Sequence, residues 1–196
     1  MASTAPGVFS SSVVVDLPLP FKSQLDMNDA DLILGDCGPS QVAMVVQYLR
    51  GIRLSVNDVV QRMTGMGLQP DYAFVLDLVK VFRSYGVNCD HFVNISWNTV
   101  EADLRAGFPI VALTNYRRLP YTPFNFDGGH YVSLKGIKRR EPEGPIIVYM
   151  DPYRPPNDGY MGEAWETPAR FSDAWSNGIW GTRRWFQNPR QGIRFR

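Results

Sequence analysis

One short stretch governs how the rest of the chain is interpreted: Gly35-Asp36-Cys37-Gly38-Pro39-Ser40. It leads into the clearest helical pattern of the sequence, in which apolar residues recur at positions i, i+3, i+4 and i+7, namely Val42, Val45, Val46 and Leu49. Pro39 suits the first turn of such a helix, and Gly51 suits its end. We therefore expect Cys37 at the N-terminus of a largely buried helix, with the polar residues on the opposite side: Gln41, Gln47 and Arg50.

A cysteine at this position can act as a nucleophile. The free N–H groups and the dipole at a helix N-terminus favour the thiolate, which is the reactive form of the side chain. Gly38 would leave room for a substrate backbone beside the sulfur. The alternative is that Cys37 is a small buried residue packed at a helix end, because free cysteines are often buried and inert. The stretch by itself favours neither interpretation.

Two later residues bear on this choice, His130 and Asp151. His130 lies in Asp127-Gly128-Gly129-His130-Tyr131-Val132, at the start of a predicted strand, and a thiolate needs a base as partner. Asp151 follows the next predicted strand. If the two strands form an antiparallel hairpin, the Asp151 carboxylate comes within reach of the imidazole and can hold its tautomer. The alternatives are an ordinary polar residue for His130 and a turn former before Pro152 for Asp151.

The order and context of these residues resemble the bacteriocin-leader-processing-like (double-glycine-type) cysteine peptidases of the papain-like superfamily. The resemblance spans about residues 17 to 180, and six segments carry it: Leu19-Pro20-Phe21-Lys22-Ser23-Gln24, Asp36-Cys37-Gly38-Pro39-Ser40, Gly107-Phe108-Pro109-Ile110-Val111, Gly128-Gly129-His130-Tyr131-Val132-Ser133, Val148-Tyr149-Met150-Asp151-Pro152 and Phe171-Ser172-Asp173-Ala174-Trp175. It implies a papain-like fold with Cys37 and His130 as the catalytic pair. It also implies Asp151 as the third member of a triad and Gln24 as donor to an oxyanion.

The remaining pattern predicts an α+β fold, because helices come first and strands follow. Helices are expected at residues 55–64, 71–85, from Ser96 to Gly107 and, briefly, at 171–176. Strands are expected at residues 87–93, 110–113, 131–137, 146–150 and 183–186. The nucleophile should lie on a central helix packed against an antiparallel sheet. We expect a flexible arm at residues 1–15 and a single domain at residues 16–196.

Composition narrows the classes of function. The 196 residues are 44% hydrophobic and carry a formal net charge of +1, which does not fit a globally basic nucleic-acid binder. No secretory signal and no apolar run of about 18 residues is visible, so we expect a soluble, cytoplasmic protein without membrane insertion. Two cysteines and two histidines make a poor zinc inventory, and we expect no metal or cofactor. A Cys37–Cys89 disulfide and a second pair, Cys89 with His91, are the alternatives for the cysteines.

Basic residues dominate the end of the chain, where five arginines occur without an acid: Arg183, Arg184, Arg190, Arg194 and Arg196. They alternate with aromatic residues. Contact with a polyanion or an anionic surface is one interpretation, and an exposed strand and tail balanced by acidic residues elsewhere is the other. Because these arginines lie well beyond Asp151, we expect the tail to be dispensable for the chemistry.

The leading hypothesis is hydrolysis of a peptide or amide bond in a peptide or protein substrate through a thioester acyl-enzyme. One alternative is the same triad acting on a peptidoglycan cross-bridge or an isopeptide amide. Another is a non-catalytic binding module that retains the fold. The sequence contains no P-loop, so double-glycine leader cleavage is not inferred. It gives no indication of the oligomeric state.

Overall fold

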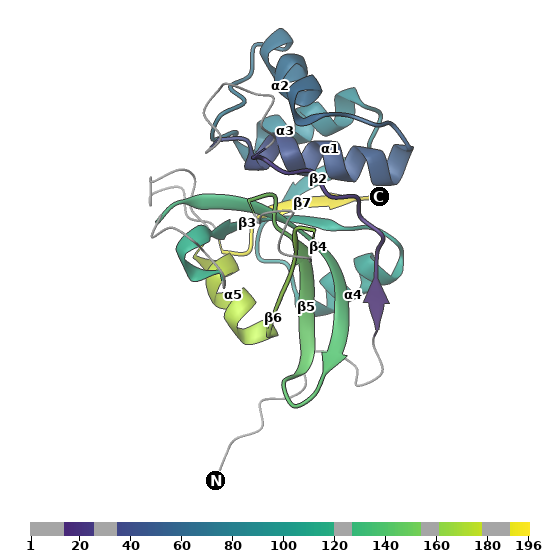
Figure 1. Ribbon diagram of the computed structural model, residues 1–196, viewed down its shortest axis with the longest axis vertical. Helices are drawn as coiled ribbons and strands as arrows, with labels where there is room; N and C mark the ends of the chain where they lie inside the picture. The colour runs from purple at the N-terminus through teal and green to yellow at the C-terminus, as the bar shows by residue number, and fades with distance from the viewer. Residues whose placement is uncertain (1–13, 26–34, 120–126, 154–160, 178–188) are drawn as a thin grey trace.

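Most of the helices precede most of the strands in a computed structural model, which describes residues 14–25, 35–119, 127–153, 161–177 and 189–196 (Figure 1). The helices are α1 (Cys37–Arg50), α2 (Val56–Gly65), α3 (Val75–Ser84), α4 (Trp97–Arg105) and α5 (Pro168–Ser176). The strands are β1 (Val15–Asp16), β2 (Cys89–Phe92), β3 (Ile110–Asn115), β4 (Gly129–Arg140), β5 (Gly144–Met150), β6 (Glu163–Glu166) and β7 (Gly192–Phe195). The predicted α+β class is confirmed.

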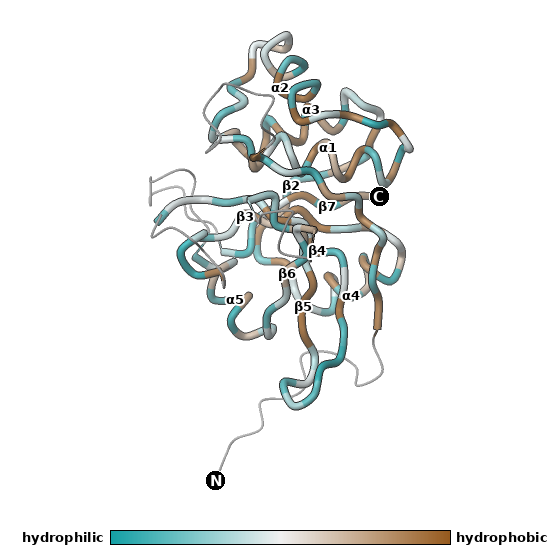
Figure 2. The backbone as a smooth tube through the Cα atoms, in the orientation of Figure 1, coloured by the Kyte–Doolittle hydropathy of each residue, from teal (hydrophilic) through white to brown (hydrophobic). Residues whose placement is uncertain are grey.

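The strands form one antiparallel sheet in the order β2-β7-β3-β4-β5-β6. Strand β4 is long enough to pair with two strands along the same edge. Its first half pairs with β3, and its second half pairs with β1 through Ile137 and Gly136. The predicted hairpin of β4 and β5 is present, with its charged turn at the hydrophilic tip in Figure 2.

Both faces of the sheet are covered. Helices α1, α2 and α3 lie over one face, and α4 and α5 lie over the other (Figure 1). Strand β3 shows how the sequence achieves this: Val111 and Leu113 point into the core under α1 and α3, whereas Ile110 and Ala112 point into the core under α4 and α5. A strand buried on both sides reads as a continuous apolar run, as β3 does.

Local signals set several helix starts. The Ser55 side chain accepts from the Asp58 N–H while the Asp58 carboxylate accepts from the Ser55 N–H, which is the predicted capping box of α2. Ser96 caps α4 as predicted. Helix α3 begins later than expected, at Val75 instead of about residue 71. Tyr72 has a φ of 52°, which no α-helix tolerates, and its N–H donates to the carbonyl of Gly35.

The end of the chain corrects an expectation. Strand β7 is not an exposed tail, because it lies inside the sheet between β2 and β3, where Ile193 and Phe195 are buried. The signal for this strand is the alternation of these two residues with Arg194 and Arg196. The strand predicted at residues 183–186 falls outside the described residues, and so do Arg183 and Arg184.

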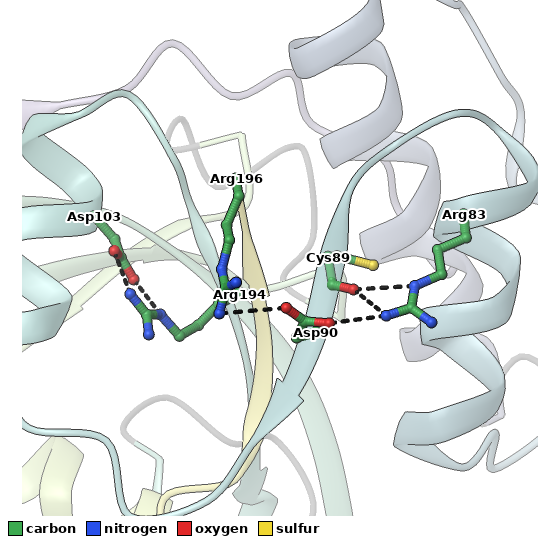
Figure 3. A network of polar contacts seen from close by, with 6 residues as sticks. All are labelled: Arg83, Cys89, Asp90, Asp103, Arg194 and Arg196. Atoms are coloured by element: carbon green, nitrogen blue, oxygen red, sulfur yellow. Dashed lines mark hydrogen bonds and ion pairs between the residues drawn. The ribbon is translucent and has the colours of Figure 1, made fainter.

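Arg194 and Arg196 of this region both form ion pairs within the fold (Figure 3). Arg194 makes a two-pronged ion pair with Asp103, at 2.6 and 2.7 Å, and Arg196 pairs with Asp90 at 3.3 Å. Arg83 of α3 binds the same Asp90 at 2.8 Å. These arginines are therefore not free cations, as their interpretation as a polyanion contact would require.

The N-terminal arm expected at residues 1–15 lies outside the described residues except for its last two positions, of which Val15 belongs to β1. Strand β6 was not predicted. None of the helices in the described part of the chain combines the length and the apolar character that a membrane crossing requires.

Candidate active site

Cys37 is the first residue of α1, as the sequence predicts, and its side chain is buried. The helix continues for 14 residues to Arg50, and Gly51 ends it in the left-handed conformation. Its first ten residues are all buried between α3 and the sheet. The sulfur is thus carried by the rigid, central helix of the molecule, at the end where free N–H groups favour an anion.

Gly38, the residue after Cys37, is needed for a different reason from the one expected. A Cβ atom at Gly38 would lie 3.2 Å from a methyl carbon of Leu78 and 3.4 Å from the Cβ of Ala73. Gly38 therefore lets α1 approach α3 and the segment before it. The space that the sequence suggested for a substrate backbone is filled by the packing of these helices.

His130 and Asp151 lie together at one end of the sheet. His130 is the second residue of β4, and Asp151 directly follows β5, so the hairpin brings the two side chains side by side. Nε2 of His130 is 2.7 Å from an Oδ atom of Asp151, and both residues are buried. The same carboxylate oxygen accepts from the Tyr153 N–H at 2.9 Å, which fixes its orientation.

The third side chain of the group is Cys37, whose interaction with the His130 imidazole helps to raise the pKa of the histidine. Because Nε2 faces Asp151, Nδ1 is the nitrogen left for the sulfur. Three segments far apart in sequence thus meet in the linear order that the sequence predicts: sulfur, imidazole, carboxylate.

The electrostatics of this group favour a charged imidazole. Burial alone lowers the pKa of His130, but the adjacent Asp151 carboxylate and the Cys37 side chain outweigh it and raise that pKa to about 10. The imidazole therefore carries a proton at neutral pH and can stabilise an anionic sulfur beside it.

This shift predicts a pH dependence of stability. A histidine whose pKa rises from 6.5 to about 10 on folding binds more protons in the folded state between these values, so its contribution to stability is complete below pH 6.5 and is lost as the pH rises towards 10. The free energy of unfolding of the wild type should fall over this range relative to that of Asp151→Asn, in which the amide carries no charge. Urea denaturation of both proteins at pH 6.5 and pH 10 measures the difference. An equal change in the free energy of unfolding of the two proteins would contradict the raised pKa of His130.

Sequence reasoning missed Tyr116. Its ring packs edge-on against the His130 imidazole, with centroids 4.8 Å apart, and against Tyr153 at 5.7 Å. Burial raises the pKa of the Tyr116 hydroxyl, and the nearby Asp151 charge raises it further, so the ring stays neutral. No local signal marked this residue: Tyr116 follows β3, and its place beside His130 depends on the register in which Thr114 pairs with His130.

Gln24 is buried and lies next to this group along the backbone. Its N–H donates to the carbonyl of Pro152, the residue after Asp151, at 2.9 Å. The chain before α1 is thereby tied to the end of β5. The predicted role of its side chain as an oxyanion donor stays a prediction.

The rival pair lies elsewhere. Cys89 is completely buried in the core beneath α3, with its sulfur 3.8 Å from the Val79 carbonyl, and burial raises its thiol pKa to about 11. Burial lowers the pKa of His91. Neither shift suits a thiolate–imidazolium pair. Both cysteines are free, so the alternative of a Cys37–Cys89 disulfide is wrong. No cluster of metal-binding side chains occurs among residues whose positions are described.

Comparison with known proteins bears on the fold and on the family of the chain. We found no significant match among curated proteins. A crystal structure of a protein from Bacillus anthracis, assigned as a C39-like peptidase, superposes with a TM-score of 0.63 at 18% identity, covering 94% of this chain and 98% of that one. At this identity the likeness shows the fold alone. The sequence profile of the Peptidase C39 like family matches residues 17–177. The predicted papain-like fold is confirmed, and the chain belongs to the Peptidase C39 like family.

Proposed function

We propose that the chain is a cysteine peptidase that hydrolyses a peptide or amide bond, with Cys37 as nucleophile, His130 as acid and base, and Asp151 as the residue that orients His130. The observation that carries this proposal is the bond of 2.7 Å between the buried His130 and Asp151, together with the interaction of Cys37 with the same imidazole. Family membership supports the same class of activity.

The reaction follows from the positions of these groups. The Cys37 sulfur attacks the carbonyl carbon of the scissile bond, while the thiol proton resides on Nδ1 of His130. The tetrahedral intermediate collapses to a thioester when the C–N bond breaks and the imidazolium returns that proton to the leaving amine. Water, deprotonated by His130, then attacks the thioester, releases the acid product and restores the thiol.

Two further residues have roles in this scheme. The Gln24 side-chain amide and the Cys37 backbone N–H would donate to the oxyanion of both tetrahedral intermediates. Tyr116 would shield the His130–Asp151 bond from water on one side, because its ring covers the imidazole. Exclusion of water strengthens an ion pair between buried groups.

The test is the reactivity of the two cysteines, followed by mass spectrometry of the labelled peptides. Iodoacetamide at pH 7 should alkylate Cys37 of the native protein at least about tenfold faster than Cys89, whose thiol pKa is raised to about 11. His130→Ala should remove most of this advantage, whereas His91→Ala should leave it unchanged. Equal, slow labelling of both thiols in the folded wild type would contradict the proposal.

Hydrolysis itself is measured on a library of unstructured peptides with mass-spectrometric detection of new termini. Cys37→Ala is the matched control, since it removes only the buried thiol at the start of α1. Cleavage that survives in Cys37→Ala would assign the activity to another residue or to a contaminant. Cleavage of a branched isopeptide or of a peptidoglycan cross-bridge alone would keep the triad and change the substrate class.

A further inference from the structure

A polar residue lies where the sequence pattern expects none, at the centre of the contact between α1 and β4. Gln41 was expected on the polar side of α1, together with Gln47 and Arg50, but its side chain is completely buried against the sheet. A buried amide costs free energy unless its donors and acceptors are satisfied. Both ends of the Gln41 amide have partners, and both partners belong to β4.

The first partner is a backbone carbonyl next to the proposed base. Nε2 of Gln41 donates to the carbonyl of Tyr131 at 3.0 Å. Gln41 lies one helical turn after Cys37, and Tyr131 directly follows His130. One hydrogen bond thus joins the helix that carries the sulfur to the strand that carries the imidazole, close to both.

The second partner holds the amide in this orientation. The Ser133 hydroxyl donates to Oε1 of Gln41, and it lies on the same face of β4 as Tyr131, two residues along. With the carbonyl oxygen of the amide engaged by a hydroxyl, the NH₂ group is left pointing at the Tyr131 carbonyl. Both interactions are buried.

The sheet cannot satisfy the Tyr131 carbonyl by itself. Leu113, opposite Tyr131 on β3, donates its N–H to Gln191, on the side away from β4. The polar groups of Tyr131 therefore point towards β5, which ends where Met150 pairs with Ser133. Continuing that register would place Pro152 opposite Tyr131, and a proline has no N–H to donate. A donor must come from outside the sheet.

We propose that Gln41 is a positioning residue, which sets the register of α1 on β4 and thereby the separation of the Cys37 sulfur and the His130 imidazole. The proposal rests on the proposed function of this site. An apolar residue of the same length would pack against β4 equally well but would leave the helix free to settle where its side chains fit best. A single buried polar residue fixes the register of packed helices in some proteins.

The variant that tests it is Gln41→Met, which keeps the length of the side chain and removes both hydrogen bonds. The readout is the rate of Cys37 alkylation by iodoacetamide at pH 6 relative to pH 9, because at pH 6 the thiol reacts rapidly only with the imidazolium held beside it. We expect this ratio to fall at least about tenfold, and kcat to fall about 100-fold with KM changed less than about twofold, as a displacement of about 1 Å produces.

Two control variants separate positioning from simple destabilisation. Val46→Ala removes a completely buried side chain from the same helix and should lower the melting temperature without changing the alkylation ratio. Ser133→Ala removes the hydroxyl that orients the amide but leaves Nε2 of Gln41 able to reach the Tyr131 carbonyl, so it should change the alkylation ratio less than Gln41→Met does. If Gln41→Met does not fold, the double variant Gln41→Met with Ser133→Ala, which leaves no unpaired hydroxyl, serves in its place.

An unchanged ratio in a folded Gln41→Met protein would overturn the proposal, as would an equal change in Val46→Ala at the same loss of melting temperature. The readout needs no substrate, so its failure is distinct from failure of the proposed function. If His130→Ala leaves the wild-type ratio unchanged, the proposed function fails. If His130→Ala lowers the ratio and Gln41→Met does not, only the positioning role of Gln41 fails.

Discussion

Deletion of Pro189–Arg196 is expected to leave the chain unfolded, although these residues are distant in sequence from the proposed site. The deletion removes β7 from between β2 and β3, and with it the side chains of Ile193 and Phe195. Loss of two such core side chains costs about 5–10 kcal/mol, which is comparable with the whole stability of a typical domain. Far-UV circular dichroism and gel filtration of the truncated chain measure the outcome.

The control for this deletion is Arg196→Ala, which keeps the strand and removes only a charge. The ion pair of Arg196 with Asp90 spans 3.3 Å between exposed side chains, so its loss should cost at most about 1 kcal/mol. A truncated chain that melts cooperatively near the wild-type temperature would show that β7 is an accessory strand. It would also restore the sequence-based expectation that the tail is dispensable.

His130→Ala should abolish hydrolysis to within the limit of a sensitive assay, because His130 is the residue proposed to accept and return the proton of Cys37. Loss of a base in comparable triads lowers kcat by about 10⁶-fold. Asp151→Asn should retain roughly 50–100-fold more activity than His130→Ala, since Asp151 orients the base and does not exchange a proton with the substrate.

The measurement is single-turnover cleavage of a peptide identified in the library, with Asp173→Asn as the matched control. Asp173 is an exposed carboxylate paired with Arg118 on the surface of α5, outside the proposed site. The Asp173→Asn protein should cleave the peptide at the wild-type rate. Equal loss of activity in His130→Ala and Asp151→Asn would mean that the carboxylate does more than orient the imidazole.

The sequence indicated which elements carry the candidate site residues, but it did not indicate the strand order of the sheet. Cys37, His130 and Asp151 each stand next to a local signal: a helix start, a pair of glycines before a strand, and a strand end before Pro152. Since a hairpin joins the last two, a short-range rule was enough to bring them together. Only the position of α1 against the sheet had to be taken from the family resemblance, because hydrophobic periodicity does not indicate which face of a sheet a helix covers.

The parts that were missed depend on contacts between segments far apart in sequence. Strand β7 has four residues, and its partners β2 and β3 lie much earlier in the chain, so its arginines suggested a surface. Gln41 was placed by polarity on the outer side of α1, whereas its side chain is buried against β4 and its amide donates to the Tyr131 carbonyl. Which backbone groups need a hydrogen-bond partner from outside the sheet can be judged only when the strand register is known.

The late position of β7 has a consequence for the route by which the chain folds. Strands β2 and β3 are synthesised long before the strand that separates them, and contacts of such large sequence separation slow folding. Until β7 inserts, β2 and β3 present bare hydrogen-bonding edges to the solvent, and these are templates for pairing between molecules. Refolding yield should therefore depend on protein concentration, because insertion of β7 competes with aggregation of chains that lack it.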